Sequence, residues 1–171
     1  MAAIESVLQQ WLASASGLPS GWVHQQRAAP PFSPGYGTLQ LVDWQATGWA
    51  PGVDYLSVPG DMEHLRRTRR RTGTLSVLAQ LFTAATVGET SAFGLLIAAR
   101  EALDSPDTYE AMGAVGLGLN GARPVRNLTG LVGVEWQGRA ALELSFLVDQ
   151  VSEGLVDTIR EVAVSHLLPG G

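Results

Sequence analysis

Residues 62–82 read Met62-Glu-His-Leu-Arg-Arg-Thr-Arg-Arg-Arg-Thr-Gly-Thr-Leu-Ser-Val-Leu-Ala-Gln-Leu-Phe82. The second part of this segment, from Leu75 to Phe82, is apolar and is typical of a buried β-strand. The first part carries five of the chain's eleven basic residues: Arg66, Arg67, Arg69, Arg70 and Arg71. We predict one long strand over residues 62–82, or two strands joined at Gly73.

On an extended backbone alternate residues share a face, which places Arg67, Arg69 and Arg71 on one side and Arg66 and Arg70 on the other. The five guanidinium groups therefore cannot all meet one partner surface. Guanidinium groups pair bidentately with carboxylates and phosphates. Three interpretations carry equal weight: a solvated edge that blocks aggregation, an acidic protein surface, or a phosphate backbone. The acidic surface could belong to another copy of this chain, which has 16 carboxylates.

Length and composition limit the class of protein. A chain of 171 residues that is 46% hydrophobic and 16% charged is expected to fold as one globular domain over residues 1–171. The net charge of −5 argues against a protein that coats duplex DNA. The absence of cysteine excludes disulfides and thiolate metal sites. The first residues carry no basic leader, and the apolar run over 92–99 is shorter than the roughly 20 residues of a membrane span. We therefore expect a soluble protein made in a cytoplasm, without a membrane partner.

Upstream of the long strand, apolar residues at helical spacing predict a helix over residues 3–16 that ends at Gly17 and Pro19. A short strand is expected over residues 21–26 and a longer one over residues 36–47, with a proline-rich segment between them. Residues 48–61 contain three glycines and two prolines, and they predict a loop or a distorted hairpin end.

Downstream, a helix is predicted over residues 88–103, with Thr90 or Ser91 as its cap, and a further short helix begins at Ser105-Pro-Asp107. Residues 125–134 and 140–151 are expected to form a hairpin joined around Glu-Trp-Gln-Gly138. Residues 158–164 fit either a strand or a helical turn, and residues 166–171 a flexible tail. The pattern predicts an α+β fold, with a mostly antiparallel sheet flanked by an N-terminal helix and a central helix.

No segment has the pattern of a catalytic, cofactor or metal site. Gly116-Leu-Gly-Leu-Asn-Gly121 matches a dinucleotide-binding motif, but the residues after it resemble a strand rather than the required helix. The three histidines are isolated, and no serine lies in a nucleophile elbow. Asp104, Asp107 and Glu110 fit the electrostatics of a helix start better than an acid–base pair. We predict that the chain is not an enzyme and uses no cofactor.

Three patterns resemble the neck or tail-terminator proteins of tailed bacteriophages, which complete the tail and join it to the head. The first is a helix that ends in Trp11-Leu-Ala-Ser-Ala-Ser-Gly17. The second is Val23-His-Gln-Gln-Arg-Ala-Ala-Pro-Pro-Phe-Ser-Pro-Gly-Tyr-Gly-Thr-Leu39. The third is the arginine-rich strand followed by a helix and by Gly138-Arg-Ala-Ala-Leu-Glu-Leu-Ser-Phe146. Together these patterns span nearly the whole chain.

The resemblance implies a virion protein that forms a six-fold ring at the head-proximal end of a tail. Its partners would be itself, the head–tail connector, the tail tube protein, a sheath in some tails, and genome DNA that passes through the lumen without sequence recognition. It would be located in the virion, and in the host cytoplasm during assembly. Candidates for interface or channel contacts are the five arginines, Trp49 and Arg139. The alternative is a stand-alone nucleic-acid-binding module that uses Arg66–Arg71.

Overall fold

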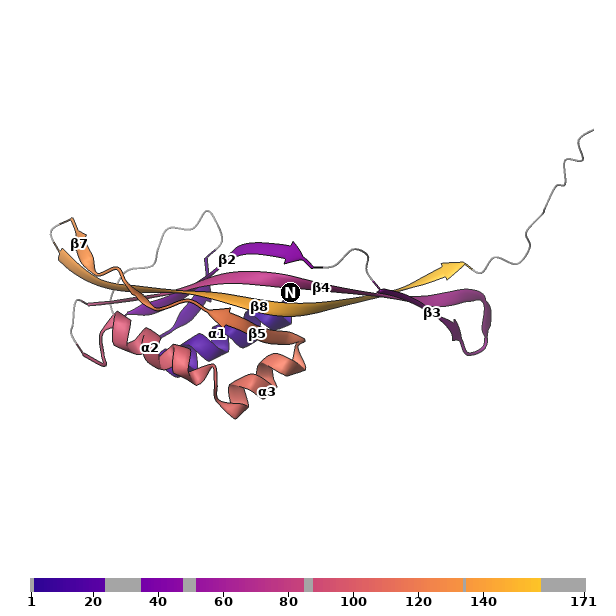
Figure 1. Ribbon diagram of the computed structural model, residues 1–171, viewed down its shortest axis with the longest axis horizontal. Helices are drawn as coiled ribbons and strands as arrows, with labels where there is room; N and C mark the ends of the chain where they lie inside the picture. The colour runs from indigo at the N-terminus through magenta and orange to yellow at the C-terminus, as the bar shows by residue number, and fades with distance from the viewer. Residues whose placement is uncertain (1, 24–34, 48–51, 85–87, 134, 158–171) are drawn as a thin grey trace, which may run out of the picture.

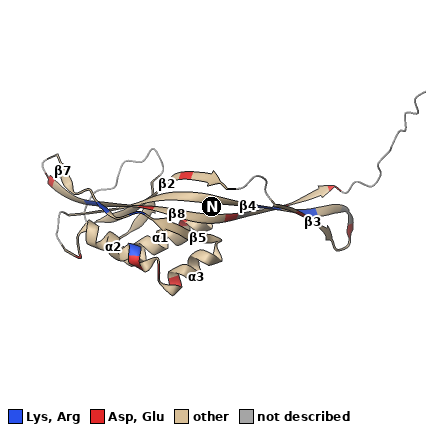
Figure 2. Ribbon diagram, in the orientation of Figure 1, with Lys and Arg blue, Asp and Glu red and all other residues tan. Residues whose placement is uncertain are grey.

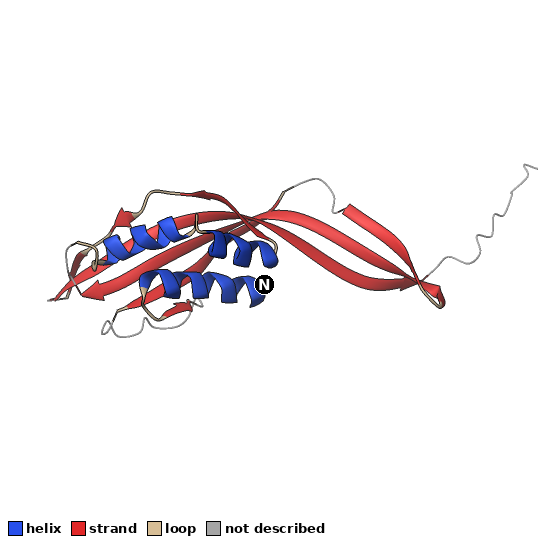
Figure 3. Cartoon of the chain, turned by 90° about the horizontal axis from the view of Figure 1, so that it is seen from below, coloured by secondary structure: helices blue, strands red, loops and turns tan. Residues whose placement is uncertain are grey.

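The computed structural model describes residues 2–23, 35–47, 52–84, 88–133 and 135–157. The described chain forms one mixed sheet of eight strands with three helices. All three helices lie on the same face of the sheet, as two views at right angles show (Figure 1; Figure 3). The α+β prediction and its N-terminal helix are confirmed.

Two long antiparallel strands, β4 (Asp61–Ala84) and β8 (Glu135–Asp157), form the centre of the sheet. They pair without a register shift, from His64 opposite Asp157 to Ala84 opposite Gln137. The strand predicted over residues 62–82 is therefore one continuous strand that passes through Gly73.

Shorter strands extend both edges of this pair. On one edge, β2 (Tyr36–Ala46) pairs with the second part of β4, and β1 (Ser20–Trp22) joins β2 in parallel. On the same edge, β3 (Gly52–Val58) pairs with the first part of β4. On the other edge, β5 (Leu117–Ala122), β6 (Arg126–Asn127) and β7 (Gly130–Val132) pair with β8. All of these pairs except β1–β2 are antiparallel.

The helices cover one face of the sheet because alternate residues of its central strands are apolar. α1 (Ala2–Ser16), α2 (Ala92–Ala102) and α3 (Pro106–Ala114) contribute to a core with both strands. Burying each large apolar side chain contributes roughly 1.5–3 kcal/mol. On the two central strands the core residues are Leu75, Val77, Ala79 and Leu81 of β4, with Ala140, Leu142, Leu144, Phe146 and Val148 of β8. The core therefore occupies only the part of the two strands that begins near Gly73.

The helix ends follow the predicted capping signals. Gly17, with φ 68°, follows the last residue of α1. Ser91 caps α2, since its side chain accepts a hydrogen bond from the Gly94 amide at 3.0 Å. Ser105 caps α3 by accepting from the Thr108 amide at 3.3 Å. The helix expected over residues 88–103 thus begins four residues later, because Gly88 to Ser91 form the turn before it.

Of the loop and the distorted hairpin end predicted over residues 48–61, the structure has the hairpin: residues 52–58 form β3, which pairs with β4 and shifts register between Ser57 and Val58. The second hairpin, predicted to turn around Gly138, is misplaced. The hairpin turn lies at Gly133, with φ 65°, and residues 135–138 belong to β8. Its first strand is broken into β6 and β7 because the Asn127 side chain accepts from the Thr129 amide at 3.0 Å and turns the chain.

Several predictions concern segments that lie partly or wholly outside the described residues. The short strand expected over residues 21–26 is seen as β1, which ends at Trp22, and residues 24–26 lie outside the described residues. The proline-rich segment before Gly35, residues 158–164 and the tail over residues 166–171 lie outside them as well.

Candidate functional site

The central strands continue past the helix layer as a three-stranded extension. We call it the arm: β3, residues 61–72 of β4 and residues 149–157 of β8. No described helix covers it on either face (Figure 1; Figure 3). Of the side chains described in the arm, only Thr68 is buried. The arm is therefore held by backbone pairing and cross-strand contacts, not by a core.

The arginine run lies on the middle strand of the arm. Because β4 and β8 pair without a shift, its odd-numbered residues continue the pleat face that the helices cover in the body. Arg67, Arg69 and Arg71 lie on that face, and Arg66 and Arg70 lie on the opposite one. Four of the five are exposed, and Arg67 is half-buried.

The two faces of the arm differ in charge because their neighbours in register differ. On the face of Arg66 and Arg70, the strands on either side place Asp54 and Glu153 beside Thr68, between the two arginines. Asp149 lies on the same face and accepts a hydrogen bond from the Thr72 hydroxyl at 2.7 Å. These carboxylates balance the positive charge of that face.

On the face of Arg67, Arg69 and Arg71, the described residues in register beside these arginines include no carboxylate. The neighbours in register are Tyr55 and Gly154 beside Arg67, and Val53 and Ser152 beside Arg69. We call these three arginines, with Val53 and Tyr55, the arginine face. Figure 2 shows basic and acidic residues on the arm, and mainly acidic residues with one basic segment on the α2–α3 side of the body.

None of the five guanidinium groups has an ion pair or side-chain hydrogen bond within the part of the chain that the structure describes. Elsewhere an arginine can find such a partner: the Arg123 Nε lies 3.2 Å from a Glu143 carboxylate oxygen, and Arg126 binds the same side chain. Like charges on neighbouring positions of one face repel each other. Within the described residues, no ion pair offsets this repulsion on the arginine face.

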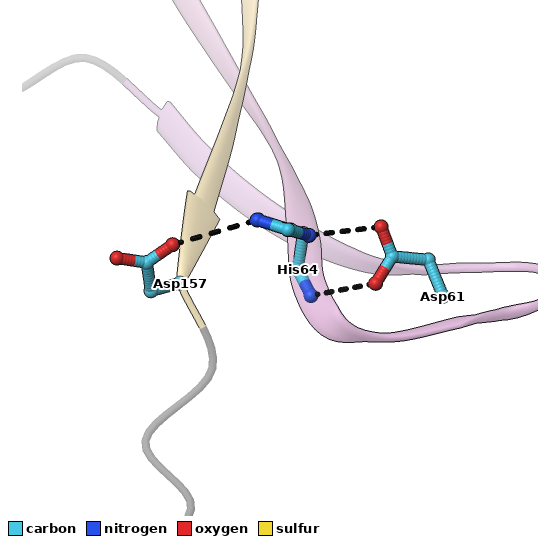
Figure 4. A network of polar contacts seen from close by, with 3 residues as sticks. All are labelled: Asp61, His64 and Asp157. Atoms are coloured by element: carbon cyan, nitrogen blue, oxygen red, sulfur yellow. Dashed lines mark hydrogen bonds and ion pairs between the residues drawn. The ribbon is translucent and has the colours of Figure 1, made fainter.

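Polar contacts hold the tip of the arm. The His64 amide donates to Asp61 Oδ1 at 3.2 Å, and His64 Nδ1 lies 2.9 Å from Asp61 Oδ2. His64 Nε2 is 3.6 Å from Asp157 Oδ1 (Figure 4). These contacts link the β3–β4 turn to Asp157, the last described residue of β8, at the end of the arm.

The structure does not bring Arg139 together with the arginine run. Arg139 lies at the other end of the β4–β8 pair, with its guanidinium 5.3 Å from the centre of the Phe82 ring. Phe82 in turn stacks on Tyr36 with ring centres 4.8 Å apart. Burial raises the pKa of Tyr36, and the charge of Arg139 opposes that rise. Trp49 lies outside the described residues.

The arm also contains residues that the sequence prediction missed. Tyr55 and Val53 lie in the segment predicted as a loop or a distorted hairpin end, and no functional role was predicted for them. Tyr55 is 57% exposed and lies beside Arg67 in register. An exposed tyrosine next to unpaired arginines is a composition typical of protein interfaces.

The described residues contain no group of three or more side chains that could hold a metal ion. Among them, no helix is both long and apolar enough to cross a membrane.

The chain matches a known protein family. The family model described as phage neck terminator protein matches residues 2–169. The match covers α1, both central strands and the arm. No curated protein sequence matches the chain.

Proposed function

We infer the function from the family, because this chain belongs to the phage neck terminator protein family. We propose that it forms a six-fold ring at the head-proximal end of a phage tail. Membership in the family confirms the resemblance found in the sequence. It makes the chain a structural protein of the phage virion, located in the tail or neck, that interacts with other head or tail components. In our proposal the ring ends the tail tube, docks onto the head connector and leaves a lumen for DNA.

The arm is the observation that supports this proposal. It presents exposed apolar side chains, and arginines without an ion pair among the described residues, on three strands without a core of their own. Such a surface gains more from protein contact than from solvent, since a partner supplies carboxylates and removes apolar area from water. A ring needs a surface of this kind on every subunit.

The proposed partners follow from the ring. One side of it contacts the connector and the other the tail tube, together with a sheath in a contractile tail. DNA passes through without sequence recognition, and the net charge of −5 favours weak contact with the moving genome. We propose that the subunit acts as a single domain without catalytic residues, and that it assembles in the host cytoplasm.

The test is to replace Arg67, Arg69 and Arg71 together by Ser. These side chains have no partner in the described subunit, so the variant is expected to fold while ring formation and head–tail joining fall. Light scattering gives the oligomeric mass, and electron microscopy counts joined particles after complementation of a phage that lacks the gene.

The matched control is Arg66→Ser with Arg70→Ser. It removes positive charge from the face that already carries Asp54 and Glu153. We expect this variant to assemble more nearly like the wild type than the triple variant. Normal joining by the triple variant would show that Arg67, Arg69 and Arg71 are only solvated.

The second candidate is a stand-alone nucleic-acid-binding module, favoured by five guanidinium groups on one strand that have no ion pair among the described residues. It predicts a monomer that binds duplex DNA with an affinity that falls steeply with salt, the slope reporting the number of phosphates contacted. The ring proposal predicts a ring with weak affinity for free DNA. Mass measurement together with a salt titration of DNA binding separates the two.

A further inference from the structure

The arginine face lies where the helix layer stops. In the body the same pleat face of β4 and β8 is covered by helices, and on the arm it is bare (Figure 3). The bare part combines an exposed aromatic ring, Tyr55, with three guanidinium groups that have no ion pair among the described residues. A partner that fits this face must supply carboxylates and a recess for an aromatic side chain.

The outer surface of the helix layer supplies both. Asp104, Asp107 and Glu110 are exposed on α3 and the turn before it, and none has an ion pair within the described residues. We call these three residues the acidic corner. Arg100 is the only basic residue in the three helices. The corner therefore presents three carboxylates to the solvent, which matches the arginine face in number.

A groove lies beside the acidic corner. It runs between α1 and α3, has a volume of about 440 Å³, and has Asp107 in its lining. Its walls include the small or apolar residues Val7, Ala15, Ala102 and Ala111. A tyrosine ring is apolar on its faces and polar at its tip, which suits a recess with this lining.

The arginine face and the acidic corner of one subunit would each contact a different neighbouring copy. In both views the arm extends away from α3, so the two surfaces do not meet within one chain (Figure 1; Figure 3). A contact between two different patches of identical chains is head-to-tail, and it closes into a ring when the rotation between neighbours allows it.

We propose that the arginine face of one copy docks on the acidic corner of the next copy, with Tyr55 inserted in the groove between α1 and α3. This inference rests on the proposed ring and names the contact that builds it. Arginine–carboxylate pairs fix the orientation of the two subunits, and the aromatic side chain anchors the contact.

Charge reversal tests the contact. In the first variant, Arg67, Arg69 and Arg71 are replaced by Glu. In the second, Asp104 and Glu110 are replaced by Arg, and Asp107 is kept because it stabilises the first turn of α3. Each variant alone brings like charges together at every contact, so light scattering should give a monomer mass. An equimolar mixture restores opposite charges at each contact and should give a ring that contains both variants in equal amounts.

The outcomes separate this contact from the proposed ring. If both variants alone form rings of wild-type mass, another contact builds the ring and the docking proposal is wrong. If both variants are monomers and their mixture forms no ring, the arginine face does not dock on the acidic corner, and the docking proposal is also wrong. If the wild-type chain forms no ring, either in solution or on tails, the proposed function itself is rejected.

A cysteine pair tests the same contact without changing its charges. The chain has no cysteine, so Tyr55→Cys with Ala111→Cys leaves a disulfide between neighbouring copies as the expected product. Mild oxidation of the assembled double variant should give a ladder of covalent oligomers on a non-reducing gel. The control is Leu56→Cys with Ala111→Cys, because Leu56 lies on the opposite face of the arm. A ladder from the control, or none from the test pair, would overturn the proposal.

Discussion

At the scale of single residues, Gly73 marks the place where the body of the sheet gives way to the arm. A Cβ atom at this position would lie 2.9 Å from the Trp44 ring and 3.0 Å from the Gln45 carbonyl oxygen. We predict that Gly73→Ala destabilises the fold by about 1–3 kcal/mol, because neither the ring nor the backbone can move away without loss of packing. Urea unfolding followed by circular dichroism measures the change.

Gly154 is the matched control for Gly73, since it also lies within a long central strand. No atom lies within 4 Å of a Cβ placed at Gly154. Gly154→Ala should change the free energy of unfolding by less than about 0.5 kcal/mol. Equal losses for the two variants would mean that both glycines act through backbone freedom and not through contact with Trp44.

The arginine run shows how far single residues could be predicted. Its division between two faces followed from the two-residue repeat of a strand, which is a local property. The charge balance of each face was not predictable, because it depends on which strands flank β4. Asp54 lay in a segment predicted as a loop or a distorted hairpin end, and Glu153 in no predicted element. The sequence therefore did not show which carboxylates flank each face.

At the scale of elements, one buried hydrogen bond joins α1 to α2. The Trp11 indole N–H donates to the Ala99 carbonyl at 3.0 Å, and Trp11 is 5% exposed. We predict that Trp11→Phe costs roughly 1–3 kcal/mol of unfolding free energy, since it leaves a buried carbonyl without this donor. Trp136→Phe is the control, because Trp136 is 65% exposed and should cost less than about 0.5 kcal/mol. A similar cost for both would show that the bond to Ala99 does not stabilise the helix pair.

The elements divide into those with local signals and those that depend on a partner. Ser91, Ser105 and Gly17 act within a few residues of their helix ends, so α1, α2 and α3 were predicted from the sequence. β3 was predicted only as an alternative to a loop, because a short run between two prolines becomes a strand only when β4 pairs with it. The hairpin turn was misplaced because Glu135 and Trp136 pair with Val132 and Leu131 of β7 and so belong to β8.

At the scale of the whole molecule, the arm could not be predicted from the sequence. The arginine-rich part and the apolar part of β4 follow each other without a break, so the sequence does not show that only one of them is covered by helices. Only the placement of the helices shows that part of the β4–β8 pair has a core and part does not. The family was predictable because it depends on the order of elements along the chain, which survives errors in single strands. The contact surfaces were not predictable from the sequence, because they depend on how far the helix layer extends.

The division of the β4–β8 pair into a part with a core and a part without one predicts how stability is distributed in the free subunit. Amides of residues 61–72 and 149–157 should exchange hydrogen for deuterium faster than those of residues 73–84 and 138–148, which belong to the same two strands. Both parts have paired backbones, but only the second has buried apolar residues that must be exposed when it opens. Peptide-level mass spectrometry on the monomer resolves the two parts. In the assembled ring the arm should become protected, whereas the Arg67, Arg69, Arg71→Ser variant should keep its fast exchange. Slow exchange of the arm in the free monomer would show that strand pairing and the contacts of His64 are sufficient to hold it, and that its stability does not depend on a neighbouring subunit.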